Sequence, residues 1–94
     1  MGRGTGKFGE CAMCEGEKPL TFHHLIPRTT RTNKWFKKNF ERAAFDEGID
    51  ICRDCHLFIH KHYGEKHLGR ELNSLEKLLS DPVIFKFVQW VRKR

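Results

Sequence analysis

Cysteine and histidine residues in this sequence stand at spacings that suit the binding of metal ions. The stretch over residues 48–62 reads GIDICRDCHLFIHKH and contains Cys52, Cys55, His56 and His60. In a helix, residues four apart lie one turn apart on the same face, so the imidazoles of His56 and His60 can converge on one ion. The stretch therefore predicts two metal sites on one helix, a closed structural zinc site and an open catalytic site.

A second CxxC pair, formed by Cys11 and Cys14, lies far upstream and is followed by Gly16. A glycine at this point fits a tight knuckle that turns both thiols to one side. Together with Cys52 and Cys55, the pair predicts a tetrahedral zinc site with four cysteine ligands. A redox-active CxxC pair is the alternative, but the βαβ pattern that surrounds such a motif is not found in this sequence.

Two adjacent histidines, His23 and His24, fall within the stretch over residues 20–26, which ends at Pro27 and predicts a strand. Side chains alternate between the two faces of a strand, so the two imidazoles are expected to point in opposite directions. This arrangement indicates two roles, one as a metal ligand and one free to act on a substrate. The alternative is a pair of strand histidines held by local hydrogen bonds.

The elements that position these residues can be read from the pattern of apolar side chains. Residues 1–9 predict a flexible basic tail, since only one large apolar residue is available for packing. Residues 33–45 carry aromatic and alanine residues at helical spacing and predict a helix. Residues 49–51 alternate as a short second strand, and a helix begins directly afterwards at Cys52.

The remaining chain, over residues 63–94, predicts a series of short helices. Asn73 followed by Glu76 resembles a capping box, and Asp81 before Pro82 predicts an N-cap with proline at the first helical position. We see no repeat or linker, so residues 1–94 are expected to form a single domain.

The chain has 94 residues and a formal net charge of +6, which suits a polyanionic partner such as DNA. A soluble basic protein without such a partner is the alternative. No apolar run is long enough to span a bilayer and no signal peptide is visible, so we expect no membrane partner. Cysteine pairs without a secretory signal favour metal over disulfides and indicate a reducing, cytoplasmic location.

Basic residues that can contact DNA phosphates cluster between the two predicted strands. They lie in a polar loop over residues 28–34 and on the polar face of the helix that follows. A plain solvated surface is the alternative for the lysine face. The candidate DNA-binding residues are Arg28, Arg31, Lys34, Lys37 and Lys38.

The motif HHLIP at residues 23–27, with CRDCH at residues 52–56 and His60 beyond it, resembles the HNH endonuclease family. The four cysteines are similar to those of its zinc-bearing branch. The resemblance implies an α+β fold, with a small treble-clef-like ββα-metal core and structural zinc knuckle over residues 10–62. A helical extension over residues 63–94 would follow this core.

The resemblance also implies a role for each candidate residue. His24 matches the general base, and His23, His56 and His60 match the ligands of a catalytic divalent ion. The family asparagine would lie near Glu47, where this chain has none. Asn33, Asn39 or another residue would take its place. The residues that match the structural zinc ligands are Cys11, Cys14, Cys52 and Cys55.

The implied activity is hydrolysis of DNA phosphodiester bonds, leaving 5′-phosphate and 3′-hydroxyl ends. Three neutral nitrogen ligands suit Mn²⁺, Ni²⁺, Co²⁺ or Zn²⁺ better than Mg²⁺, and we favour Mn²⁺. One active site cuts one strand, so a monomer is expected to nick, and a weak homodimer could cut both strands. The alternative is a non-catalytic treble-clef zinc module that binds DNA or protein, which leaves the four histidines unexplained.

Overall fold

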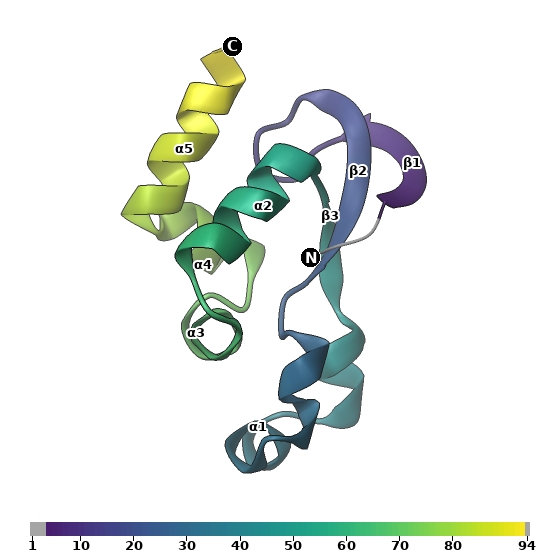
Figure 1. Cartoon of the computed structure of the whole chain (residues 1–94), viewed down its shortest axis with the longest axis vertical. Coiled ribbons are helices and arrows are strands. Elements are labelled where there is room, and N and C mark those ends of the chain that lie inside the picture. Colours follow the sequence, from purple (N-terminus) through teal and green to yellow (C-terminus); the bar gives the residue numbers. More distant parts are fainter. Residues whose placement is uncertain (1–3, 94) are drawn as a thin grey trace.

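The computed structural model describes residues 4–93 and combines an antiparallel sheet with helices (Figure 1). Three strands form the sheet in the order β1 (Gly4–Glu10), β2 (Glu17–His24) and β3 (Gly48–Cys52), so β2 lies in the centre. This part of the chain is therefore an α+β structure, as the sequence predicts.

The N-terminal segment belongs to the sheet, which corrects the prediction of a flexible tail over residues 1–9. From Gly4 onward β1 pairs with β2, with Phe8 opposite Pro19 and Glu10 opposite Glu17. Residues 1–3 lie outside the described residues. Backbone pairing explains the difference, because hydrogen bonds to an otherwise open edge of β2 do not require apolar side chains in β1.

Close approach of the backbone determines where β2 and β3 meet. The two strands pair antiparallel, and at one end His24 lies opposite Gly48. A Cβ atom on Gly48 would collide with the ring of Phe22 and the carbonyl oxygen of His23. A glycine is therefore needed here to bring β3 next to the histidine pair.

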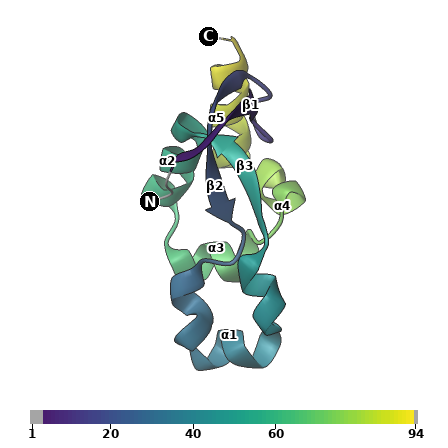
Figure 2. The ribbon, with the colours of Figure 1, turned by 90° about the vertical axis from the view of Figure 1, so that its right-hand side faces the viewer.

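The segment between β2 and β3 forms a lobe at one end of the molecule (Figures 1 and 2). It contains a 3₁₀ helix (Arg28–Thr32), the helix α1 (Lys34–Asn39) and a second 3₁₀ helix (Arg42–Asp46). The single helix predicted over residues 33–45 is wrong, because the chain is extended at Phe40, with φ −132° and ψ 142°.

Aromatic packing holds this lobe together and joins it to the helix α3 (Glu65–Glu71). Phe36 and Phe45 form a separate apolar cluster with Ile26. α3 approaches closely through Gly69, where a Cβ atom would lie 2.5 Å from the Phe36 ring. The break at Phe40 thus turns the chain back so that its aromatic residues face one another.

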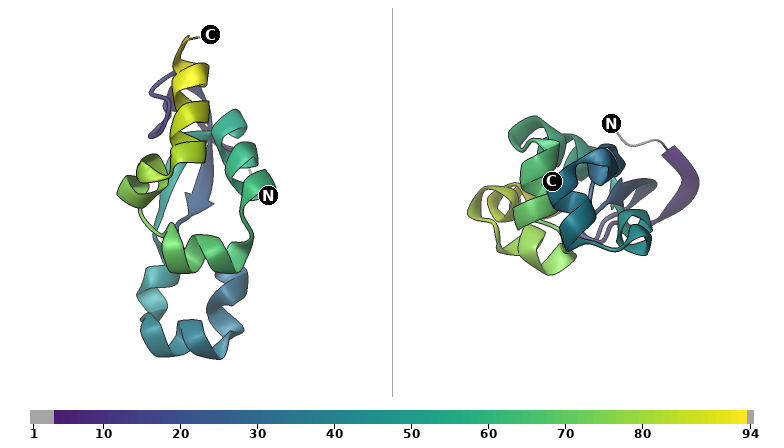
Figure 3. Two further views of the ribbon diagram at one scale, coloured as in Figure 1. Left: turned by 90° about the vertical axis from the view of Figure 1, so that its left-hand side faces the viewer. Right: turned by 90° about the horizontal axis from the view of Figure 1, so that it is seen from below.

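The helices that follow β3 lie on one face of the sheet (Figures 2 and 3). They are α2 (Arg53–His62), α3, α4 (Leu75–Ser80) and α5 (Pro82–Lys93), and α2 lies against both β2 and α5. The main apolar core forms between the helices and the sheet and includes the four cysteines. Within residues 4–93, none of the helices has the length and apolar character needed to cross a bilayer.

The N-termini of the last two helices are capped by side chains. Asn73 was predicted to cap α4, but Ser74 does so, accepting a backbone hydrogen bond of 3.1 Å. Asn73 instead donates to the carbonyl oxygen of Gly69 (3.0 Å). The cap predicted at Asp81 is confirmed, since its carboxylate accepts from the backbone N–H of Ile84 (3.1 Å).

Candidate metal centres

Three separate segments bring the four cysteines into one buried cluster. Cys11 and Cys14 come from the knuckle between β1 and β2, Cys52 ends β3, and Cys55 lies in the first turn of α2. All four side chains are buried, and their sulfur atoms lie within 4.8 Å of one another. Thiols from two parts of the sequence therefore meet where the knuckle, the strand and the helix join.

The spacing of the sulfur atoms fits a tetrahedral metal site. The Sγ atoms of Cys11 and Cys55 are 3.9 Å apart, and those of Cys14 and Cys52 are 3.8 Å apart. A tetrahedron of sulfur atoms about 2.3 Å from zinc has edges of about 3.8 Å, whereas a disulfide bond is about 2.0 Å long. The four buried cysteines can therefore bind a zinc ion.

Hydrogen bonds prepare one of these thiols for metal binding. The Sγ atom of Cys11 accepts from the backbone N–H groups of Met13 (3.4 Å), Cys14 (3.4 Å) and Cys52 (3.2 Å). The side-chain interactions of Cys11 with Cys52 and Cys55 lower the pKa of Cys11 strongly. The side-chain interaction with Cys11 raises the pKa of Cys52 to about 11. The cluster thus favours one thiolate, and a metal ion would displace the remaining protons.

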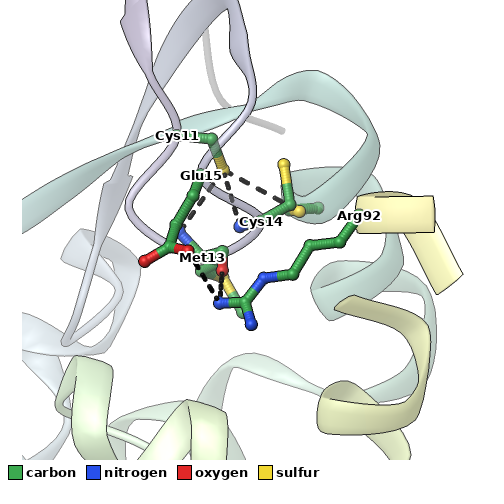
Figure 4. A network of polar contacts seen from close by, with 6 residues as sticks. Cys11, Met13, Cys14, Glu15 and Arg92 are labelled. Atoms are coloured by element: carbon green, nitrogen blue, oxygen red, sulfur yellow. Dashed lines mark hydrogen bonds and ion pairs between the residues drawn. The ribbon is translucent and has the colours of Figure 1, made fainter. Parts of the chain in front are cut away.

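The knuckle is braced from the far end of the chain (Figure 4). Arg92 on α5 donates to the carbonyl oxygen of Met13 (3.0 Å) and forms an ion pair with Glu15 (3.6 Å). Glu15 adopts the left-handed conformation, with φ 65°, although the sequence suggested that Gly16 would provide the turn. α5 therefore fixes the loop that carries the first cysteine pair.

A second cluster brings together His23 of β2 with His56 and His60 of α2. Their candidate ligand nitrogens lie within 4.8 Å of one another. The ring centroids are 5.1 Å apart for His23 and His56, 5.4 Å for His23 and His60, and 4.9 Å for His56 and His60. The i, i+4 pair predicted from the sequence therefore converges with the strand histidine.

The environment of these three histidines suits a divalent cation. His23 is 1% exposed, and neither of its ring nitrogens has a hydrogen-bond partner. Buried polar atoms are rarely left unpaired, so a metal ligand role would satisfy one of them. Burial lowers the pKa of His23 to about 3 and that of His56 to about 4, and it also lowers the pKa of His60. At neutral pH the cluster is therefore uncharged and can donate nitrogen lone pairs.

His24 points away from His23, as the alternation of a strand predicts. Its ring packs edge-on against Phe22 at a centroid distance of 4.9 Å, on the other side of β2 from the histidine cluster. Burial lowers its pKa, and the charge of Arg28 adds to this effect. His24 nevertheless lines the same cleft of about 210 Å³ as His56 and His60. A molecule bound in this cleft can therefore contact His24 as well as His56 and His60.

Glu65 also lines this cleft and was not identified from the sequence. Its carboxylate raises the pKa of His60, against the larger effect of burial. No motif marks this residue, since it reaches the cleft through the turn between α2 and α3.

Neither asparagine considered for the family position lines the cleft. The side chain of Asn33 accepts from the backbone N–H of Trp35 (2.9 Å), and Asn39 donates to the carbonyl oxygen of the same residue (2.7 Å). Both therefore stabilise α1. Near the expected position, a backbone hydrogen bond of 3.1 Å joins Leu25 to Glu47 and links the ends of the two strands.

A second, larger hollow of about 670 Å³ lies on the lobe. Three of the predicted DNA-binding residues line it, and Arg28 also lines the histidine cleft. Arg42 adds a further positive charge to the hollow, which the carboxylate of Asp46 also lines. Two of the candidates, Lys34 and Lys38, lie on α1 outside this hollow. The basic residues that line the hollow are Arg28, Arg31, Lys37 and Arg42.

Comparison with known proteins finds a similar sequence in a bacterial protein. The chain is 33% identical over 87 residues to the uncharacterized protein YisB of Bacillus subtilis (strain 168). The aligned region covers 92% of this chain and 76% of that protein. No family model matches the chain, and no solved structure matches it.

Proposed function

We propose a nuclease function for this chain, which belongs to the family of the Bacillus subtilis protein YisB. The proposed activity is hydrolysis of DNA phosphodiester bonds by an HNH endonuclease with a ββα-metal core. The observation that carries the proposal is the cleft that His24 lines together with His56 and His60, two of the three candidate metal ligands. A zinc module that only binds DNA or protein would need the four cysteines but not this second cluster.

The chemistry of the cleft supports hydrolysis. A divalent ion held by His23, His56 and His60 would supply positive charge to the phosphate and to the departing 3′ oxygen, and nitrogen ligands favour Mn²⁺ over Mg²⁺. His24 is neutral at pH 7 because burial lowers its pKa, so its ring can accept a proton from an attacking water molecule. The expected products carry 5′-phosphate and 3′-hydroxyl ends.

The hollow on the lobe, lined by four basic residues, supports DNA as the partner. Arg28 borders both the histidine cleft and the hollow, so a bound strand can continue from one to the other. The guanidinium group of Arg28 can hold a phosphate through paired hydrogen bonds. The cations of the hollow then bind neighbouring phosphates, which position DNA without reading its sequence.

The test is nicking of supercoiled plasmid in a Mn²⁺ titration by the wild type, His24→Ala and His60→Ala. Loss of a general base is expected to lower the rate about 10²–10⁴-fold while metal content and DNA affinity are kept. Loss of His60 is expected to weaken Mn²⁺ binding, so that excess Mn²⁺ partly restores nicking. We expect no rescue of His24→Ala at any Mn²⁺ concentration.

A matched control is His67→Ala, since His67 is exposed and stacks on Tyr63 at a centroid distance of 5.0 Å. This variant should nick like the wild type. Nicking that persists in a chelator, or a His24→Ala variant that is fully active, would contradict the assignment. Absence of nicking with every divalent ion tested would favour the non-catalytic module.

A further inference from the structure

The hydroxyl group of Thr21 lies behind the histidine cluster and contacts one of its members. The Nδ1 atom of His56 is 2.8 Å from the hydroxyl oxygen of Thr21, and this oxygen is 2.9 Å from the carbonyl oxygen of Ile51. Thr21 is 8% exposed and His56 is 4% exposed. These groups therefore depend on one another for hydrogen bonds, because little bulk water reaches them.

The number of protons fixes the direction of both hydrogen bonds. A carbonyl oxygen can only accept, so the single hydroxyl proton of Thr21 is donated to Ile51. The hydroxyl oxygen can then only accept from His56, and this requires a proton on Nδ1. A neutral imidazole carries one ring proton, so the Nε2 atom of His56 keeps a free lone pair.

We propose that Thr21 is a positioning residue that holds His56 as the Nδ1-protonated tautomer and thereby presents Nε2 to the metal ion. This inference rests on the proposed function only in identifying that ion as the catalytic one. His23, in contrast, has no hydrogen-bond partner at either ring nitrogen. His56, unlike His23, is therefore oriented before the ion binds, and partners of this kind typically contribute about 10–100-fold to metal affinity.

The spacing of Thr21 and His23 along the sequence is consistent with this contact. Thr21 and His23 are two residues apart on β2, so both side chains point toward α2. The hydroxyl also belongs to a residue paired with Ile51 in the sheet. The strand thus supplies one ligand and orients another.

The first test reads the tautomer directly in the wild-type protein, with zinc retained and no other divalent ion added. Two-bond ¹H–¹⁵N correlation spectra at pH 7 distinguish protonated from unprotonated ring nitrogens. We expect the Nδ1 atom of His56 to be protonated and Nε2 to be unprotonated. A spectrum showing the proton on Nε2 would overturn the proposal, whatever the behaviour of any variant.

The second test compares Mn²⁺ affinities, measured from the electron paramagnetic resonance signal of free Mn²⁺. Thr21→Val keeps the shape but removes the hydroxyl, and we expect about 10–100-fold weaker binding with unchanged zinc content. Thr21→Ser keeps the hydroxyl and should bind like the wild type. Thr30→Val is the control, because Thr30 is similarly buried at 5% exposure and donates to the carbonyl oxygen of Pro27 (2.6 Å).

The Mn²⁺ affinities of these variants distinguish a positioning role of the Thr21 hydroxyl from a packing role of the side chain. Wild-type affinity in Thr21→Val would overturn the proposal, and so would equal losses in Thr21→Val and Thr21→Ser. Neither test uses DNA. A protein that shows the expected tautomer and affinities but never nicks would refute the nuclease function and keep this role for Thr21.

Discussion

Acid should destabilise this protein through His23, even when the histidine cluster holds no ion. Burial lowers the pKa of the folded imidazole to about 3, whereas the unfolded imidazole has a pKa of about 6.5. Between these values the unfolded state binds more protons than the folded state. The free energy of unfolding therefore falls as the pH is lowered from about 6.5 towards 3, and it is at its full value above this window.

The difference between the folded and unfolded pKa values of His23 determines how much the free energy of unfolding falls. Between pH 7.0 and 5.5 the unfolded imidazole goes from about one quarter to about nine tenths protonated, while folded His23 stays neutral. The resulting loss is about 1.3 kcal/mol from His23 alone. Urea unfolding at these two pH values, with zinc content checked at each, measures it. The wild type should lose at least this amount.

His23→Gln removes the titrating group and should reduce the loss by about 1.3 kcal/mol, whatever its effect on stability at pH 7. The control is Ile59→Val, which shortens a fully buried side chain on the same helix as His56 and costs about 0.5–1.5 kcal/mol. This control should shift the stability equally at both pH values. Equal losses in the wild type and His23→Gln would refute the assignment of a buried, neutral imidazole.

Three further predictions address other parts of the molecule. Cys52→Ala should release zinc, lower the melting temperature and weaken Mn²⁺ binding, whereas His60→Ala should keep its zinc; metal analysis and calorimetry measure both. DNA affinity should fall steeply with salt, and Arg42→Gln should reduce the slope of log K against log salt by up to about 0.9, more than the control Lys38→Gln. Ser74→Ala should cost about 1 kcal/mol in urea unfolding, because the N-cap of α4 is lost.

The ligand clusters could be predicted because the spacing of side chains along regular elements is fixed. The i, i+4 spacing of His56 and His60 and the opposite directions of His23 and His24 follow from helix and strand geometry alone. Residues grouped by tertiary contact were harder to identify. Glu65 reaches the cleft only because a turn after α2 places it there.

Other differences arise where backbone pairing or packing overrides local preference. β1 forms from a glycine-rich segment because β2 offers it an edge to pair with. The helical pattern over residues 33–45 breaks at Phe40 because the lobe packs its aromatic rings against one another, with Phe40 and Phe45 at a centroid distance of 6.4 Å. Neither the pairing of β1 with β2 nor the packing of these rings alters the spacing of apolar residues, so periodicity could not reveal them.

The cysteine cluster and the histidine cluster both include residues of α2. We therefore expect the histidine site to depend on an intact cysteine site, but not the reverse. Cys55 and His56 are consecutive, so their side chains leave the helix about 100° apart, one toward the knuckle and the other toward β2. The cysteine cluster joins the start of α2 to the knuckle and to the end of β3, and Arg92 braces that knuckle. His56 follows Cys55 directly and His60 lies one turn further on, and both belong to the second cluster with His23 of β2. Opening the cysteine site therefore frees the helix that carries two of the three histidines, whereas emptying the histidine site leaves the start of α2 in place.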